Sequence, residues 1–151
     1  MSLVPLLPEA GLVRVIYASR WGARAREDLP HVVRAVVAQS APVNAGRDVT
    51  SLLLVHGGWF VQALEGPVAA VRDIFAKIAS DPRHFDVSVL ASGSAEQRLF
   101  GAFAMAERRL SPNDDRLLEQ LGLDEAFRPD QLGADAALLL MTSISQIAQA
   151  A

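Results

Sequence analysis

The chain has 151 residues, 51% of them hydrophobic and 21% charged, which excludes a disordered chain and suits one domain with a short appendage. Its formal net charge of −3 argues against direct nucleic-acid binding, which needs a basic surface. Because it has no cysteine and only three scattered histidines, we expect neither a disulfide framework nor a metal site.

The first half of the chain predicts a strand, a helix and a hairpin. Residues 12–18 are rich in β-branched and aromatic side chains, which is typical of a strand. From Asp28, apolar residues recur at spacings of three and four, so we expect a helix that ends before Pro42. The runs 51–55 and 59–64 are strand-like, and the glycines between them supply the positive φ that a tight hairpin needs.

The second half adds a helix and two strands. Pro67 opens a helical pattern that ends at Asp81 and Pro82, and strands are expected at 87–91 and 99–105. The resulting order β-α-β-β-α-β-β predicts an α+β fold, namely a ferredoxin-like sheet with two helices on one face.

The last part of the chain predicts a helical extension. Residues 111–114 are typical of a helix start, and 134–150 form an apolar helical pattern. We therefore divide the chain into a core domain, 1–107, and a C-terminal extension, 108–151. An apolar helix needs burial, which favours a homo-oligomer. The chain start lacks the basic segment of a signal peptide and no run reaches the length of a membrane span, so we expect a cytoplasmic protein without a membrane partner.

Known catalytic motifs are missing from the sequence. It has no nucleophile elbow, no phosphate-binding glycine loop and no metal-ligand helix pair, so we expect a protein that is not an enzyme. An acylphosphatase-like hydrolase would need an arginine that cradles phosphate and an asparagine that positions water, for which Asn44 and the nearby arginines are poor support.

One spaced pattern carries chemical information. Gln62 is unusual from its position alone, because an amide between Phe60 and Leu64 on one strand face stands where an apolar side chain is expected and so needs a polar partner. In chain order the pattern consists of Ile16-Tyr17-Ala18-Ser19, Asn44 with Val49-Thr50, Gly58-Trp59-Phe60-Val61-Gln62-Ala63-Leu64-Glu65-Gly66, Asp81-Pro82-Arg83-His84, and Arg98-Leu99-Phe100 with Met105. In this order and spacing, the core domain resembles the BLUF domains, the sensors of blue light using FAD, and in particular their short stand-alone type.

The resemblance implies a blue-light photoreceptor that binds FAD non-covalently between its two core helices. Tyr17 matches the tyrosine that donates an electron and a proton to the excited flavin, and Gln62 matches the glutamine that bridges this tyrosine and the ring. A glutamine amide carries both an acceptor oxygen and donor N–H groups, so its rearrangement reverses its hydrogen bonds. Met105 matches the signalling methionine of the last strand. The resemblance implies that a separate, unidentified partner protein receives the signal.

The resemblance also assigns further contacts to the cofactor. Asn44 matches an asparagine at the pyrimidine edge of the flavin, and Ser40 occupies a position near the same pocket. Arg83 and His84 match residues that contact the flavin from the far end of the second helix, and Asp81 accompanies them in the family pattern. These residues join the tyrosine and the glutamine as predicted cofactor-binding residues.

The sequence departs from the family pattern near the pocket. Ala41-Pro42-Val43-Asn44 replaces a segment with an arginine and paired asparagines, Ser51 replaces a common glycine, and Phe103 stands where tryptophan is common. Another arginine supplies the missing cation if it lines the cleft, and the candidates are Arg14, Arg24, Arg26 and Arg34. These departures leave one alternative open, a light-insensitive ferredoxin-like module for ligand binding or regulation.

Overall fold

The structure is a computed structural model of the chain, and it describes residues 7–21, 29–82, 84–100, 106–110 and 112–150. Its centre is a five-stranded sheet in the order β4-β1-β3-β2-β5. Neighbours among the first four strands of this order run antiparallel, whereas β5 pairs with β2 in parallel. The strands are β1 (Leu12–Trp21), β2 (Thr50–His56), β3 (Trp59–Pro67), β4 (His84–Ser94) and β5 (Ala106–Arg109).

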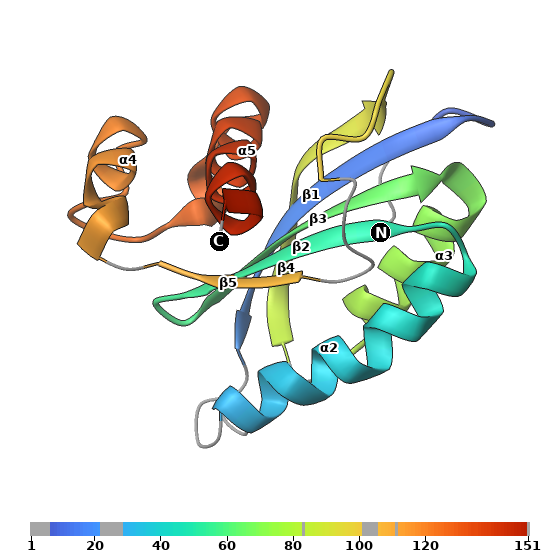
Figure 1. Cartoon of the computed structure of the whole chain (residues 1–151), viewed down its shortest axis with the longest axis horizontal. Helices are drawn as coiled ribbons and strands as arrows, with labels where there is room; N and C mark the ends of the chain where they lie inside the picture. Colours follow the sequence, from blue (N-terminus) through green and yellow to red (C-terminus); the bar gives the residue numbers. More distant parts are fainter. Residues whose placement is uncertain (1–6, 22–28, 83, 101–105, 111, 151) are drawn as a thin grey trace.

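Helices cover both faces of the sheet (Figure 1). The helices are, in chain order, α2 (Leu29–Gly46), α3 (Val68–Ala79), the 3-10 helix η1 (Pro112–Asp114), α4 (Asp115–Gln120), the 3-10 helix η2 (Pro129–Gln131) and α5 (Ala134–Ala150). The pair α2 and α3 lies on one face, and the pair α4 and α5 lies on the other. The α+β, ferredoxin-like fold with a C-terminal helical extension is therefore confirmed. Within the described ranges, no helix is long and apolar enough to cross a lipid bilayer.

The alternation of side chains along the strands produces two separate apolar clusters. On β1, Val13, Val15 and Tyr17 belong to the cluster that α3 covers. Ile16 and Ala18, which alternate with them, belong to the cluster that α5 covers. Because successive strand residues point to opposite faces, each central strand serves both clusters.

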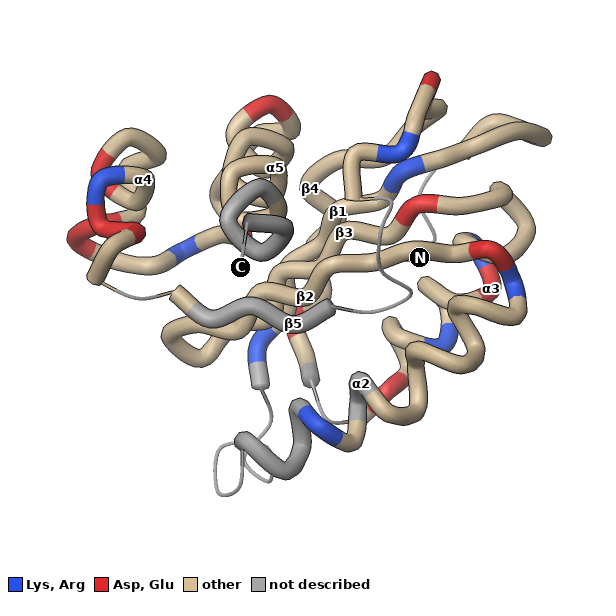
Figure 2. The backbone as a smooth tube through the Cα atoms, in the orientation of Figure 1, with Lys and Arg blue, Asp and Glu red and all other residues tan. Residues whose placement is uncertain are grey.

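Helix α5 is apolar because it is buried against the sheet. Ala137, Leu140, Met141 and Ile144 are each 0% exposed and belong to the cluster on that face. From Ala136 to Ser145 the helix carries no charged residue (Figure 2). For these four residues, cover is provided within the chain itself, whereas Leu139 on the same helix is 49% exposed.

Glycines allow two close turns beside the central strands. Gly57 and Gly58 have φ values of +58° and +87°, so the predicted hairpin between β2 and β3 is confirmed. At Gly66, a Cβ atom would lie 2.8 Å from a methyl carbon of Val49 and 2.9 Å from the carbonyl oxygen of Asp48. Any side chain there would therefore push the end of β3 away from the turn that leads into β2.

The predicted end of the first helix is wrong. Pro42 lies inside α2, which continues to Gly46. A proline removes one backbone donor, and here the carbonyl that loses its partner belongs to Ala38, an exposed residue of the helix. The cost of the interruption is low enough for the helix to continue past it.

The predicted start of the last strand is also wrong. Leu99 and Phe100 form a bend, and the strand that pairs with β2 is β5, further along the chain. The N–H groups of both residues donate to the carboxylate of Glu65, so they are not available to a β-ladder. Residues 101–105, the rest of the predicted strand, lie outside the described residues.

Candidate functional site

A tyrosine and a glutamine face each other across the two central strands. Tyr17 of β1 pairs directly with Gln62 of β3 in the antiparallel ladder. Both residues are buried, and the Tyr17 hydroxyl donates a hydrogen bond to Oε1 of Gln62. Since Tyr17 belongs to the cluster covered by α3, the pair lies on the face of the sheet that carries α2 and α3.

Neighbouring structure holds the ring of Tyr17 in place. Strand β4 contains one extra residue opposite the step from Ile16 to Tyr17, which is a β-bulge. Such bulges increase the local twist of a strand and redirect its side chains. On the helix side, the Phe75 ring meets the Tyr17 ring edge-on, with 5.6 Å between the ring centroids. These contacts keep the hydroxyl directed at Gln62.

Burial and a nearby carboxylate keep the Tyr17 hydroxyl protonated. Burial raises the pKa of Tyr17 far above its ordinary value, and the negative charge of Asp81 raises the pKa further. Tyr17 is therefore a neutral hydrogen-bond donor at every pH at which the domain is expected to be stable.

A cavity of about 180 Å³ lies beside this pair. Helix α2 supplies one wall, α3 and the residues after it supply another, and β3 contributes Gln62. The lining residues are Gln39, Ser40, Val43, Asn44, Gln62, Ile74, Lys77, Ile78 and Asp81. The structure therefore brings together four of the predicted cofactor-binding residues, Ser40, Asn44, Gln62 and Asp81, and Tyr17 joins them through its bond to Gln62.

Asn44 is held in a fixed position near the end of α2. Its side chain is buried, and Nδ2 donates a hydrogen bond to Oγ of Ser51 at 3.3 Å. Its backbone carbonyl accepts hydrogen bonds from the N–H groups of Arg47 at 3.1 Å and Val49 at 2.8 Å. Ser51, which replaces a common glycine of the family pattern, thus helps to orient the amide at the cavity.

The structure does not bring every predicted residue into the site. Arg83 and Met105 lie outside the described residues, as does the side chain of His84, whose backbone begins β4. Arg14, considered above as a replacement cation, instead makes a 2.8 Å ion pair with Glu65.

Three residues of α3 that line the cavity were not predicted as site residues, namely Ile74, Lys77 and Ile78. The apolar pattern of the helix indicates that Ile74 and Ile78 face inward, but it does not show that this face borders a cavity. Lys77 lies four residues before Asp81, a spacing that is common for exposed pairs on helices, so the sequence does not single it out. Lys77 contributes a positive charge to the lining of the cavity.

The lining residues suit a flavin. The pyrimidine edge of a flavin alternates carbonyl and N–H groups, and the amides of Asn44 and Gln62 offer acceptors and donors to such an edge. Val43, Ile74 and Ile78 add apolar surface for a flat ring. The donor set of the cavity is therefore compatible with FAD.

These features define a small α+β ligand-binding domain with a buried tyrosine–glutamine pair at its site. The chain belongs to the BLUF family, because the family model described as "Sensors of blue-light using FAD" matches residues 12–106. Members of this family sense blue light with FAD as their cofactor.

Individual relatives agree with this assignment. The blue light- and temperature-regulated antirepressor BluF of Escherichia coli (strain K12) is 41% identical over 76 residues, which are 49% of this chain and 19% of the relative. This chain therefore matches about a fifth of that relative's length. The dark-state structure of BlrB, a BLUF protein, has a TM-score of 0.66 at 26% identity and covers 91% of this chain and 97% of its own. The photo-activated state of BlsA has a TM-score of 0.82 at 24% identity, covers 89% of this chain and 95% of its own, and shows the shared fold.

Proposed function

We propose that this chain binds FAD non-covalently in the cavity between α2 and α3 and signals blue light through Tyr17 and Gln62. The observation that carries the proposal is the hydrogen bond from the Tyr17 hydroxyl to Oε1 of Gln62, at the point where Gln62 borders the cavity. Membership of the family supports both the cofactor and the response to light.

Tyr17 is the proposed donor of an electron and a proton. When bound, the flavin supplies the absorption of blue light and an excited state that accepts an electron. Tyr17 begins as a neutral phenol, because burial and the charge of Asp81 raise its pKa. A phenol that loses an electron becomes strongly acidic, so the proton of Tyr17 then moves along its existing hydrogen bond toward Gln62.

Gln62 is the proposed switch. Its Oε1 accepts the hydrogen bond from Tyr17, which leaves the Nε2 end of the same amide to face other partners. Rotation or tautomerisation of the amide exchanges donor and acceptor at both ends without a change in charge. Because Gln62 is only 4% exposed, water competes weakly and the rearranged state can persist.

The remaining contacts to the cofactor belong to the same proposal. Asn44 and Ser40 contact the pyrimidine side of the flavin from α2, and Asp81, two residues beyond the end of α3, lies near Tyr17. Their positions in the cavity wall support these roles. For Arg83 and His84, the support is the family pattern of the sequence alone.

The proposed output is a change in a separate partner protein, without catalysis by this chain. A relative named as an antirepressor supports an output of this kind. In this proposal residues 1–107 sense light, Met105 transmits the change, and residues 108–151 present it. We further propose that the chain forms a homo-oligomer, which light scattering tests, and that it lies in the cytoplasm, which cell fractionation tests. We propose no nucleic-acid partner and no membrane partner, and binding assays test both.

The decisive experiment compares difference spectra before and after blue light for the wild type and for Gln62→Leu. The leucine keeps side-chain bulk but removes every hydrogen-bonding group, and one lost neutral bond contributes only about 1 kcal/mol, so flavin should stay bound. We expect a long-lived shift in the wild type and none in the variant at equal flavin occupancy. Gln120→Leu makes the same change at an exposed site on α4 and should behave as the wild type.

Two results would contradict the proposal. A shift and dark recovery of normal size in Gln62→Leu would remove Gln62 from the switch. A wild type that binds FAD but shows no shift would favour the light-insensitive ligand-binding or regulatory module.

A further inference from the structure

A buried carboxylate on β3 has no role in the flavin site. Glu65 is 0% exposed and lies three residues after Gln62 on the same strand. Because side chains alternate along a strand, the side chain of Glu65 points to the opposite face from that of Gln62. A carboxylate at such a site needs several partners, since an unpaired buried charge is strongly destabilising.

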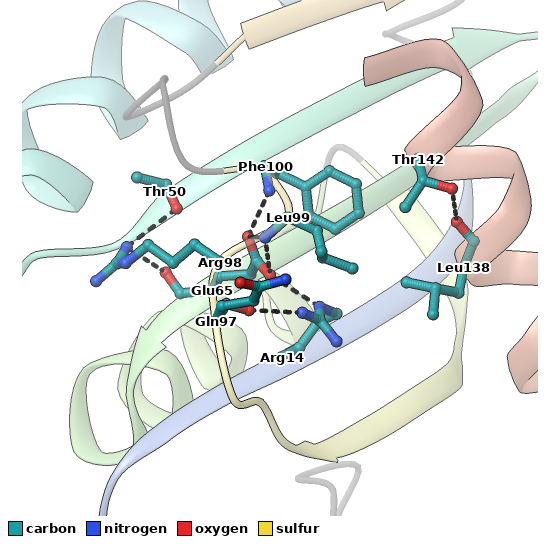
Figure 3. Close-up of polar contacts among 9 residues, drawn as sticks. All are labelled: Arg14, Thr50, Glu65, Gln97, Arg98, Leu99, Phe100, Leu138 and Thr142. Carbon is teal, nitrogen blue, oxygen red and sulfur yellow. Dashed lines mark hydrogen bonds and ion pairs between the residues drawn. The ribbon is translucent and has the colours of Figure 1, made fainter. Parts of the chain in front are cut away.

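The partners of Glu65 lie in the segment between β4 and β5. Oε1 of Glu65 accepts a hydrogen bond from the Phe100 N–H at 2.7 Å, and the Leu99 N–H donates to both carboxylate oxygens at 3.0 and 2.9 Å. Nε of Arg14 on β1 donates to Oε2 at 2.8 Å and supplies the opposite charge. Figure 3 shows the carboxylate between this segment and the two central strands.

Arg98 also attaches the segment between β4 and β5 to the sheet. Its guanidinium donates to the Glu65 backbone carbonyl at 3.2 Å and to Oγ1 of Thr50 at 3.0 Å. It also donates to the backbone carbonyl of Asp48 at 2.7 Å and forms a 3.1 Å ion pair with the carboxylate of that residue. Residues 98–100 are therefore fixed to β3 and to the start of β2 through charge-assisted bonds, which are stronger than neutral ones.

The segment also reaches α5. The side chains of Leu99 and Phe100 extend toward this helix (Figure 3). Phe100 is 1% exposed and belongs to the same buried cluster as Leu140 and Ile144 of α5. A continuous set of contacts thus leads from Gln62 along β3 to Glu65, from there to the amide of Phe100, and through its ring to the α5 face.

We infer that Glu65 is a positioning residue that couples the strand carrying Gln62 to Phe100 and α5. The inference builds on the proposed function, because Gln62 is the residue whose change it transmits. A bend held only by water would absorb a small movement of β3. A bend whose amides are held by a buried carboxylate moves with the strand, since displacement would leave the charge unpaired.

The test measures amide hydrogen exchange of the flavin-loaded protein in the dark and under blue light. Glu65→Gln keeps the shape of the side chain and removes its charge. In the dark, we expect exchange at Leu99 and Phe100 to rise about tenfold or more, because bonds to a charged acceptor are lost. Under light, the spectral shift should remain, while the light-dependent change in α5 exchange that we expect in the wild type should disappear. Glu96→Gln removes an exposed carboxylate from the same loop and should leave both responses intact.

A second arm decides the inference without light. In the dark, Gln62→Leu should change α5 exchange when Glu65 is present and leave it unchanged in the Glu65→Gln background. If the wild type shows no spectral shift, the proposed function fails, while this double-mutant comparison still decides whether the coupling exists.

The inference is overturned if α5 responds to light, or to Gln62→Leu, as strongly without the Glu65 carboxylate as with it. It is also overturned if α5 responds to neither change in the wild-type background. Should Glu65→Gln fail to fold, the double variant Arg14→Gln/Glu65→Gln replaces it, because removing both partners of the ion pair leaves no charge unpaired. A full α5 response in this folded double variant would then count against the coupling.

Discussion

On the α3 face of the sheet, β1 and β3 present Tyr17 and Gln62 beside a cavity, whereas on the α5 face the same strands present Ile16 and Ala63 to a densely packed apolar cluster. The first face combines polar groups with open space, so it can accept a ligand and rearrange its hydrogen bonds. The second face has apolar side chains that are stabilised by burial and have few alternatives. A two-residue period lets one strand supply both faces.

This difference shows why a change in the hydrogen bonds of Tyr17 and Gln62 can be local and still affect the opposite face of the sheet. Loss of one hydrogen bond on the cavity side lowers the free energy of unfolding by about 1 kcal/mol, which leaves the fold intact. The opposite face responds to movement of the strands as a packed unit, because close-packed cores transmit strain. The predictions below test this contrast, from the largest expected effect to the smallest.

The largest effect is expected on the packed face. Leu140→Ala removes a fully buried side chain of α5 and should lower the free energy of unfolding by about 2–5 kcal/mol. Leu139→Ala is the matched control, because the neighbouring leucine is 49% exposed and its loss should cost less than about 0.5 kcal/mol. Urea denaturation of the flavin-loaded proteins measures both values. Equal effects would show that α5 is not packed on the sheet as described.

The contrast between the faces was largely predictable from local sequence. The strand patterns and the glycine hairpin place Tyr17 and Gln62 on adjacent strands, and the family pattern predicts that they interact. Their hydrogen bond and the closeness of Asn44 and Asp81 agree with that prediction. The roles of these residues toward the flavin stay predictions until the variants are measured.

The long-range contacts were not predictable. Nothing local to Glu65 shows that its backbone partners, Leu99 and Phe100, lie 34 and 35 residues later in the chain, and those bonds keep the two residues out of the last strand. The helix continues past Pro42, and the residue whose carbonyl loses its partner, Ala38, is exposed, which depends on tertiary placement. The apolar pattern of α5 indicated burial correctly but could not tell a neighbouring sheet from a second copy of the chain.

On the cavity face, Asn44→Ala should weaken FAD binding and leave the fold intact. If the amide pairs with the flavin, its loss leaves buried ring groups unpaired at about 1–3 kcal/mol, or about 5- to 150-fold in Kd. Ser51→Ala separates two causes, because it removes only the hydroxyl that orients the amide and should have a smaller effect. Fluorescence titration with FAD gives both constants. Unchanged affinity in Asn44→Ala would make its role structural.

The buried phenol makes stability depend on alkaline pH. The raised folded-state pKa of Tyr17 means that above pH of about 10 the unfolded chain releases a proton that the folded chain keeps. The stability that the protonated phenol of Tyr17 contributes is therefore fully present below pH of about 10. Above that pH, the free energy of unfolding falls by about 1.4 kcal/mol per pH unit. Tyr17→Phe should therefore lose less stability than the wild type as the pH rises above about 10. Since Tyr17 is the only tyrosine in the chain, tyrosinate absorbance reports it alone and should appear only on unfolding.

The smallest effect is expected at the rim of the cavity face, where an exposed ion pair joins the turn after α2 to α3. Nη1 of Arg47 lies 3.2 Å from Oδ2 of Asp73, and the two side chains are 40% and 60% exposed. Exposed pairs contribute about 0.2–1 kcal/mol, so Arg47→Gln should lower the free energy of unfolding by no more than this. The loss should vanish at about 1 M salt, where charges on the surface are screened within about 3 Å.

Arg72→Gln provides the control for this last prediction, because it removes the same charge from an exposed position on α3. If the ion pair matters, Arg47→Gln loses more stability than Arg72→Gln at low salt, and the two converge at high salt. A loss in Arg47→Gln that persists at high salt would point instead to the backbone around Asn44, whose carbonyl accepts the Arg47 N–H. In that case flavin affinity should fall together with stability, whereas a screened surface pair would leave affinity unchanged.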